Sequence, residues 1–237
     1  MVYRCILLES IRQLRNVRSL AFTFVIPLVM LLVFGSLFGS SGQQEQRSGL
    51  PWLIVTTVQM ASYGGKLAAL SQAFAITTER SIGWNRHVRI TPLSGVGYLM
   101  SKVAAALLVA LGAVIALCAV SIIVRGAPMD APHWSTAILG IWIGVIPFAL
   151  IAVALGQFAR PSFAQPLFTV VFLGMAILGG LWIPLEVMPP WVISIAQTVP
   201  SYWLNKLGQI GADGAGNTLL PVVILAAWTV ALAALIT

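Results

Sequence analysis

Six long apolar stretches, separated by short polar segments, dominate the pattern of the chain. They cover residues 20–38, 50–77, 96–124, 135–158, 163–183 and 219–237. A helix that crosses a bilayer needs about 20 mainly apolar residues, and each stretch is about that long or longer. The pattern therefore predicts an all-α integral membrane protein, with six transmembrane helices in a single domain over residues 20–237.

A shorter amphipathic segment, residues 1–19, precedes the first apolar stretch. Its apolar positions can form one helix face, and its charge comes mainly from four arginines: Arg4, Arg12, Arg15 and Arg18. A helix of this kind lies at the lipid headgroup boundary and is attracted to anionic lipid. We therefore expect a membrane-surface helix. The alternative is an ordinary basic flank that orients the first span, and the two are compatible.

The segment between the fifth and sixth stretches, residues 184–210, is broken by proline and glycine but keeps apolar and aromatic side chains. Trp191, Tyr202 and Trp203 belong to it, and such side chains prefer the membrane interface. The pattern predicts short helices that lie on the outer surface or dip into it, followed by a glycine-rich turn.

Composition agrees with a membrane protein. Only 8% of the 237 residues are charged and 59% are hydrophobic, and the mean hydropathy is +0.97. A soluble domain carries about 25% charged residues. This chain therefore has too few charges to cover a surface that faces water.

The distribution of the charges predicts an orientation. If both termini are cytoplasmic, nine of the 13 lysines and arginines lie on the cytoplasmic side and three on the outside, with Lys66 inside a span. The nine are Arg4, Arg12, Arg15, Arg18, Arg80, Arg86, Arg89, Lys102 and Arg160. This excess follows the positive-inside rule, so the net charge of +7 requires no nucleic-acid partner.

Candidate catalytic and metal-binding motifs are weak. Residues 39–42 read GSSG, a string found in intramembrane serine proteases, but the serine needs a histidine base within hydrogen-bond reach. His87 is expected on the opposite side of the membrane and His133 in a loop. No pair of carboxylates lies within a span, and two distant histidines do not make a metal site. We therefore expect no catalytic residue and no metal.

A nucleotide-binding loop is also missing. Residues 64–67 read GGKL, whereas a phosphate loop would need glycine at Met60 and serine or threonine at Leu67. Any ATP-driven work then has to come from another polypeptide, which would hold the ATP and magnesium.

One span carries a polar stripe. Gln59, Tyr63 and Lys66 are spaced so that they share a helix face, and a lysine near the bilayer centre costs about 2.5–3.5 kcal/mol. The face can line a substrate path to which it contributes positive charge. Alternatively, Lys66 is structural and either extends to the interface or pairs with a helix-end carbonyl.

The least membrane-like stretch of the chain follows this span. It contains six polar or aromatic residues suited to contact with a soluble protein: Glu79, Arg80, Trp84, Arg86, His87 and Arg89. A short charged helix along the membrane surface would suit docking into a groove of a partner. An ordinary basic loop is the alternative.

Three regions resemble permeases of the ABC type-2 transporter family. In chain order they are LRNVRSLAFTFVIPLVMLLVFGSLFG, TTERSIGWNRHVRITPLSGVGYLMSKVAAALLVAL and LGGLWIPLEVMPPWVISIAQTVPSYWLNKLGQ. They follow one another in the same order as in the family, and the resemblance covers nearly the whole chain. The resemblance implies a connecting helix over residues 1–19, a cytoplasmic coupling helix over about 79–91, and an outer re-entrant segment over about 184–210. Lys66 departs from the family's pattern in the second span.

The resemblance also implies a function. Such a chain is the permease subunit of an exporter in a bacterial plasma membrane, paired with a second permease copy or a sister permease and with separate ABC ATPase subunits. The cargo would be a lipophilic or amphipathic drug, antibiotic or lipid. Two alternatives remain: an exporter of polysaccharide or glycolipid, and a membrane immunity or scaffold protein that does not transport.

Overall fold

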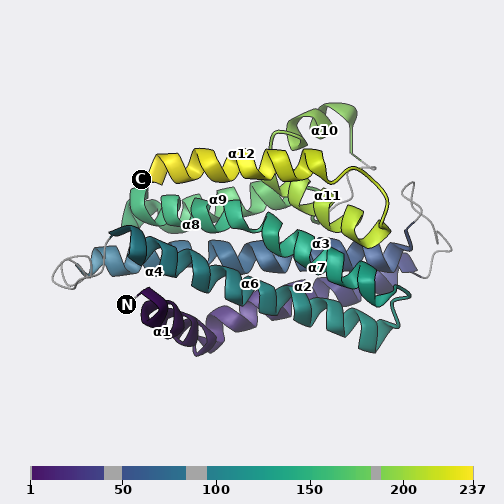
Figure 1. Cartoon of the computed structure of the whole chain (residues 1–237), viewed down its shortest axis with the longest axis horizontal. Coiled ribbons are helices and arrows are strands. Elements are labelled where there is room, and N and C mark those ends of the chain that lie inside the picture. Colours follow the sequence, from purple (N-terminus) through teal and green to yellow (C-terminus); the bar gives the residue numbers. More distant parts are fainter. Residues whose placement is uncertain (1, 40–49, 84–94, 183–187, 237) are drawn as a thin grey trace.

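The computed structural model describes residues 2–39, 50–83, 95–182 and 188–236 (Figure 1). The elements of this part of the chain are α-helices: α1 (Val2–Leu14), α2 (Val17–Gly39), α3 (Trp52–Leu70), α4 (Gln72–Ser81), α6 (Gly95–Arg125), α7 (Ala131–Gly144), α8 (Ile146–Phe158), α9 (Pro161–Leu178), α10 (Pro190–Ala196), α11 (Pro200–Asp213) and α12 (Leu219–Ile236). The predicted all-α fold class is confirmed for these residues.

Helices occupy all six of the apolar stretches that the sequence pattern marks. Three segments are long and apolar enough to cross a bilayer by length and composition: Gly95–Arg125, Ala131–Phe158 and Leu219–Ile236. Leu20–Ser36 and Ser162–Leu178 are apolar but shorter. The second stretch, which forms α3 and α4, carries the polar stripe and is therefore less apolar than the others.

Two of the predicted spans are each interrupted once. The first break separates α3 from α4 at Ser71, whose hydroxyl donates a hydrogen bond to the carbonyl of Ala68 at 2.7 Å. The second separates α7 from α8 at Val145. Pro147 explains this break, because proline has no N–H to donate to the preceding turn.

The helices run mostly along the long axis of an elongated bundle (Figure 1). Both termini lie at one end, which we call the terminal end, together with the end of α4 and the start of α6. The far end is opposite, with α11 packed among α3, α7 and α12 beside it. Helix α10 stands outside the bundle, and most of its side chains are exposed or half-buried.

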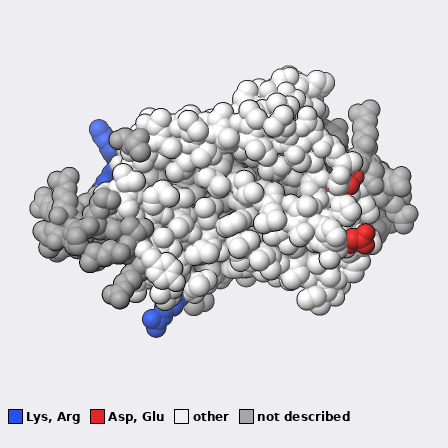
Figure 2. All heavy atoms as spheres, in the orientation of Figure 1, with Lys and Arg blue, Asp and Glu red and all other residues white. Residues whose placement is uncertain are grey.

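Charge is unevenly placed along this axis. On the face drawn in Figure 2, lysine and arginine side chains lie at the terminal end, aspartate or glutamate lies at the far end, and a wide uncharged band separates them. The far end also has a base, Arg125, the last residue of α6. The exposed acids of the far end include Asp130 and Asp213. An uncharged band between two charged ends matches the apolar core of a bilayer between its two aqueous faces.

Glycines allow α7 and α11 to pack closely. A Cβ atom added at Gly211 would lie 2.8 Å from the Ala137 backbone, and one at Gly144 would lie 2.7 Å from a Leu204 methyl group. The Thr136 hydroxyl donates a hydrogen bond to the Gly211 carbonyl at 2.6 Å. Small residues and interhelical hydrogen bonds of this kind are the usual basis of helix packing in membranes.

We expect Gly211→Ala to destabilise the bundle by about 1–3 kcal/mol, because the new methyl group would overlap the α7 backbone. Gly112→Ala is the matched control, since a Cβ at Gly112 meets nothing within 4 Å. Thermal unfolding of the detergent-solubilised protein measures both. Equal melting temperatures for the two variants would contradict the close packing of α7 and α11.

Candidate functional site

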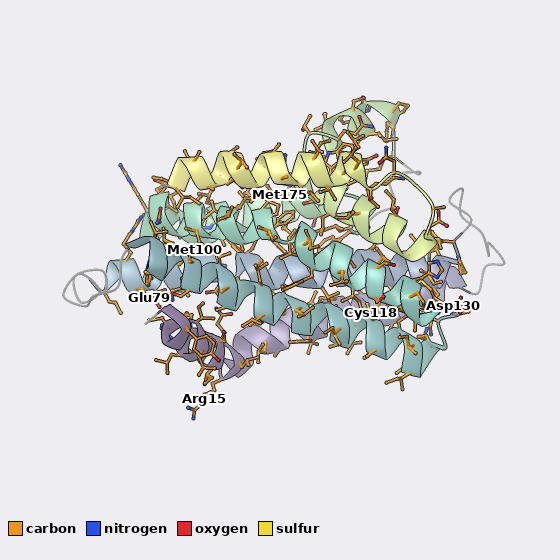
Figure 3. All side chains as sticks on the ribbon, viewed as in Figure 1. Arg15, Glu79, Met100, Cys118, Asp130 and Met175 are labelled. Carbon is orange, nitrogen blue, oxygen red and sulfur yellow. The ribbon has the colours of Figure 1, made fainter. Side chains whose placement is uncertain are left out.

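Glu79 lies in the last turn of α4 at the terminal end (Figure 3). Its side chain is only 2% exposed, whereas the sequence analysis expected it to begin the coupling helix and contact a partner. Residues 79–81 continue α4, and the chain then turns at Gly83, whose φ of +77° suits glycine. Residues 84–91, which make up most of the expected coupling helix, lie outside the described part of the chain, so that helix stays a prediction.

The Glu79 carboxylate is the centre of an ion cluster built by three helices. Arg12 of α1 and Lys102 of α6 donate hydrogen bonds to Oε1 at 2.5 and 2.7 Å, and the Tyr98 hydroxyl donates to Oε2. Lys102 also donates to Glu9 of α1 at 2.7 Å. Two acids and two bases therefore balance, and Lys102 joins α1 to α4.

The pairing of acids with bases in this ion cluster matters because Glu79 and Lys102 are buried, and an unpaired buried charge is strongly destabilising. Lys102 is 1% exposed and Glu9 14%, while Arg12 remains 62% exposed. Glu79 comes just after the second apolar stretch, residues 50–77, and so lies outside the predicted span. Burial raises the pKa of its carboxyl group, but hydrogen bonds from Lys102, Tyr98 and Arg12 outweigh this effect and hold the pKa below its usual value.

Helix α1 turns its polar side to the bundle and its apolar side outward. Ser10 is buried and Glu9 half-buried, whereas Leu7, Ile11 and Leu14 are exposed. The Arg12 and Arg15 side chains are exposed, and Figure 3 places Arg15 pointing away from the bundle. The Arg4 and Arg18 side chains are outside the description.

The other predicted coupling residues are not brought together by the described chain. Arg80 donates a hydrogen bond to the Ala159 carbonyl, between α8 and α9. Trp84, Arg86, His87 and Arg89 lie outside the described residues, so their role stays a prediction.

The polar stripe of α3 is buried inside the bundle, against α9 and the turn that follows it. Gln59, Tyr63 and Lys66 are 4%, 2% and 0% exposed. Lys66 Nζ donates to the Phe172 carbonyl at 3.3 Å and lies 4.8 Å from the centre of the Phe172 ring. Gln59 donates to the Gly180 carbonyl at 3.1 Å.

Helix α11 completes this polar region with residues that the sequence analysis missed. Asn205 donates to the same Gly180 carbonyl at 3.3 Å. Gly180 has a φ of +68°, and a Cβ at Gly179 would lie 2.2 Å from that of Ser201. Two features of the sequence could have indicated this region. They are the neighbouring glycines Gly179 and Gly180, and the spacing of Ser201 and Asn205 by one helix turn. We call Gln59, Ser62, Lys66, Gly180, Ser201 and Asn205 the Lys66 region.

Sequence reasoning also missed that Glu9, Tyr98 and Lys102 join Glu79. The available signal was the scarcity of acids, because Glu9 and Glu79 are the only two that the charge count places on the cytoplasmic side. Both contact Lys102. Among the described residues no three His, Cys, Asp or Glu side chains gather as a metal site would require.

Comparison with known proteins shows which family this chain matches. A family model described as ABC-2 type transporter matches residues 2–211. The chain is also 24% identical over 220 residues to a Bacillus subtilis (strain 168) protein named "Putative transport permease YvfS". That similarity covers 93% of this chain and 89% of the Bacillus protein.

We expect Lys102→Met to release α1 from the bundle. A buried ion pair that loses one partner is destabilised by about 3–5 kcal/mol, and the effect here falls toward the lower end because Arg12 and Tyr98 still contact Glu79. Hydrogen exchange of the α1 amides should become at least about tenfold faster. Arg15→Gln, on the exposed side of α1, is the control. Unchanged protection of α1 in Lys102→Met would show that the cluster does not hold this helix.

Proposed function

Because this chain belongs to the ABC-2 type transporter family, and is thus the membrane subunit of an ABC transporter, we propose that it is the permease of an ATP-driven exporter. Separate ABC ATPase subunits supply the energy and hold the ATP and magnesium. A second permease, either a copy of this chain or a sister protein, completes the pathway.

The observation that carries this proposal is the gathering of basic side chains, on the face drawn in Figure 2, at the end of the bundle that holds both termini (Figures 1 and 2). Basic side chains gather at the terminal end, so the positive-inside rule favours a cytoplasmic terminal end in a bacterial plasma membrane. The outward apolar side of α1 suits a helix lying in the headgroup region. Six spans then follow from the six apolar stretches.

The ion cluster supports a route from the motor to the bundle. The proposed coupling residues Trp84, Arg86, His87 and Arg89 fall between α4 and α6 in the sequence. Arg12 and Glu9 of α1 pair with Glu79 of α4 and Lys102 of α6, respectively. ATP binding would close the ATPase pair and move this segment. Glu79 and Arg80 then act by positioning it, because their side chains are already engaged with Lys102 and Ala159.

The proposed cargo is lipophilic or amphipathic, such as a drug, an antibiotic or a lipid, and it enters from the cytoplasm or the inner leaflet. The outer segments are too short to form a domain that captures cargo outside. The polar stripe of Gln59, Tyr63 and Lys66 is the proposed path, since polar side chains inside a span usually face a partner or a water-filled route.

We expect Trp84→Ala with Arg86→Ala to abolish export and to weaken ATPase binding by at least about tenfold, since tryptophan and arginine are the residue types enriched at binding hot spots. Membrane insertion should be unchanged. The measurement is co-purification of ATPase subunits in mild detergent, followed by transport in proteoliposomes. Lys206→Ala, exposed on α11, is the control.

Glu79→Ala with Arg80→Ala should also stop export, but it opens the ion cluster as well and is the less specific test. Repeated purification of the wild-type chain without an ATPase would overturn the proposal and favour a membrane scaffold or immunity protein. If the protein instead exports a polysaccharide or glycolipid, the ATP-driven mechanism stands and the proposed lipophilic cargo is wrong.

A further inference from the structure

Lys66 is a buried lysine with no acidic partner among the described residues. It lies near the middle of the segment formed by α3 and α4, about 21 Å along the helix axis from Trp52 at 1.5 Å per residue. Its side chain is 0% exposed. The ion pairs of the described residues join Arg12 and Lys102 to Glu9 and Glu79, and none includes Lys66.

The hydrogen-bonding capacity of Lys66 is also incompletely used. An ammonium group has three N–H donors, and the hydrogen bond found for Lys66 among the described residues goes to the Phe172 carbonyl. The rings of Phe172 and Tyr63 add weak attraction, at 4.8 and 5.7 Å from Nζ. Two donors of the protonated group therefore remain for another acceptor.

Further polar groups of the Lys66 region lack partners in the described chain. Ser62, one turn before Lys66 on the same face of α3, and Ser201 of α11 are both 0% exposed, and neither hydroxyl makes a hydrogen bond there. Asn205, 6% exposed, leaves its Oδ1 unpartnered. Buried polar atoms are normally satisfied. Ser62 lies one turn from Lys66 along α3, whereas Ser201 and Asn205 lie at the turn of Gly179 and Gly180, which Gln59 of α3 also contacts. These unpartnered groups along one face of α3 indicate a site that takes up a polar ligand.

The chemistry of these groups selects the charge of the ligand. Lys66 and the hydroxyl groups of Ser62 and Ser201 can donate hydrogen bonds, while Gln59 and Asn205 already direct their amide N–H groups to Gly180. The unpartnered Asn205 Oδ1 is the one acceptor among the three unpartnered groups. Donors around a positive charge favour an anionic oxygen, because charge-assisted hydrogen bonds are the stronger ones. A cationic ligand would be repelled at the same place.

We propose that the Lys66 region binds the anionic head group, a carboxylate or a phosphate, of an amphipathic cargo. The Phe172 carbonyl occupies the anion's place in the conformation seen here, and α9 has to move away from α3 to admit the ligand. The centre of the Tyr63 ring lies 5.2 Å from that of Phe172 and 5.7 Å from that of Trp182, and the three rings provide an apolar wall for the tail. This inference rests on the proposed transport function and narrows its cargo.

The test uses the permease in phosphatidylcholine nanodiscs with its ATPase subunits. The probes are dodecyl phosphate, dodecylphosphocholine and dodecyltrimethylammonium, which share a tail and differ in head-group charge. Wild type should bind dodecyl phosphate at least about tenfold more tightly than the other two, the size expected for one charge-assisted hydrogen bond. Lys66→Met should remove this preference, Lys66→Arg should keep most of it, and the exposed-site control Lys206→Met should leave it unchanged.

A preference for dodecyl phosphate that survives Lys66→Met would overturn the inference. So would a loss of thermal stability in that variant with the preference intact, because Lys66 would then be structural. If Lys66→Met does not fold, Ser62→Ala with Ser201→Ala replaces it and should weaken dodecyl phosphate binding by about threefold or more. An unchanged affinity in that variant counts against the site.

Two further measurements separate the possible sources of the ligand and the two proposals. Competition by phosphatidylglycerol added to the nanodiscs would identify a bilayer lipid as the ligand, and its absence would identify a free anionic amphiphile; both support the site. A head-group preference without ATP-dependent transport would retain the site and reject the exporter function. ATP-dependent transport without a head-group preference would support the exporter function and reject the anion site.

Discussion

A buried lysine has to find its partners among protein atoms, because water cannot reach it. Two lysines of this chain face that constraint, and they meet it in opposite ways. Lys102 lies between Glu9 and Glu79, 2.7 Å from each. Lys66 has a carbonyl and two aromatic rings. The first arrangement fixes helices in place, and the second leaves capacity for a ligand.

The ion cluster gives the terminal end its organisation. Through it, α1 is joined to α4 and α6, the two helices that flank the proposed coupling residues. The same contacts force α1 to turn its polar side to the bundle, which leaves Leu7, Ile11 and Leu14 facing outward. An apolar outer side of this kind suits a helix at the lipid headgroup boundary. One set of ion pairs thus relates the surface helix, the bundle and the proposed site of the motor.

Close helix packing, rather than ion pairing, organises the part of the bundle near its far end. Gly211 and Gly144 bring α7 against α11, and α11 in turn brings Ser201 and Asn205 to the turn after α9. The Gly180 carbonyl accepts hydrogen bonds from both α3 and α11. The Lys66 region therefore exists because small residues allow three helices to approach one turn, and the proposed anion site depends on that approach.

Sequence alone determined the helical fold class, the places of the six apolar helices and the family, because bilayer thickness and backbone hydrogen bonding leave few other solutions for such a pattern. Helix periodicity also placed Gln59, Tyr63 and Lys66 on one face. Only the tertiary structure decided that Glu79 is buried with Lys102, that Lys66 has no acidic partner among the described residues, and that Asn205 reaches Gly180. These facts depend on which helices meet, and the local pattern of a single helix carries no information about its neighbours.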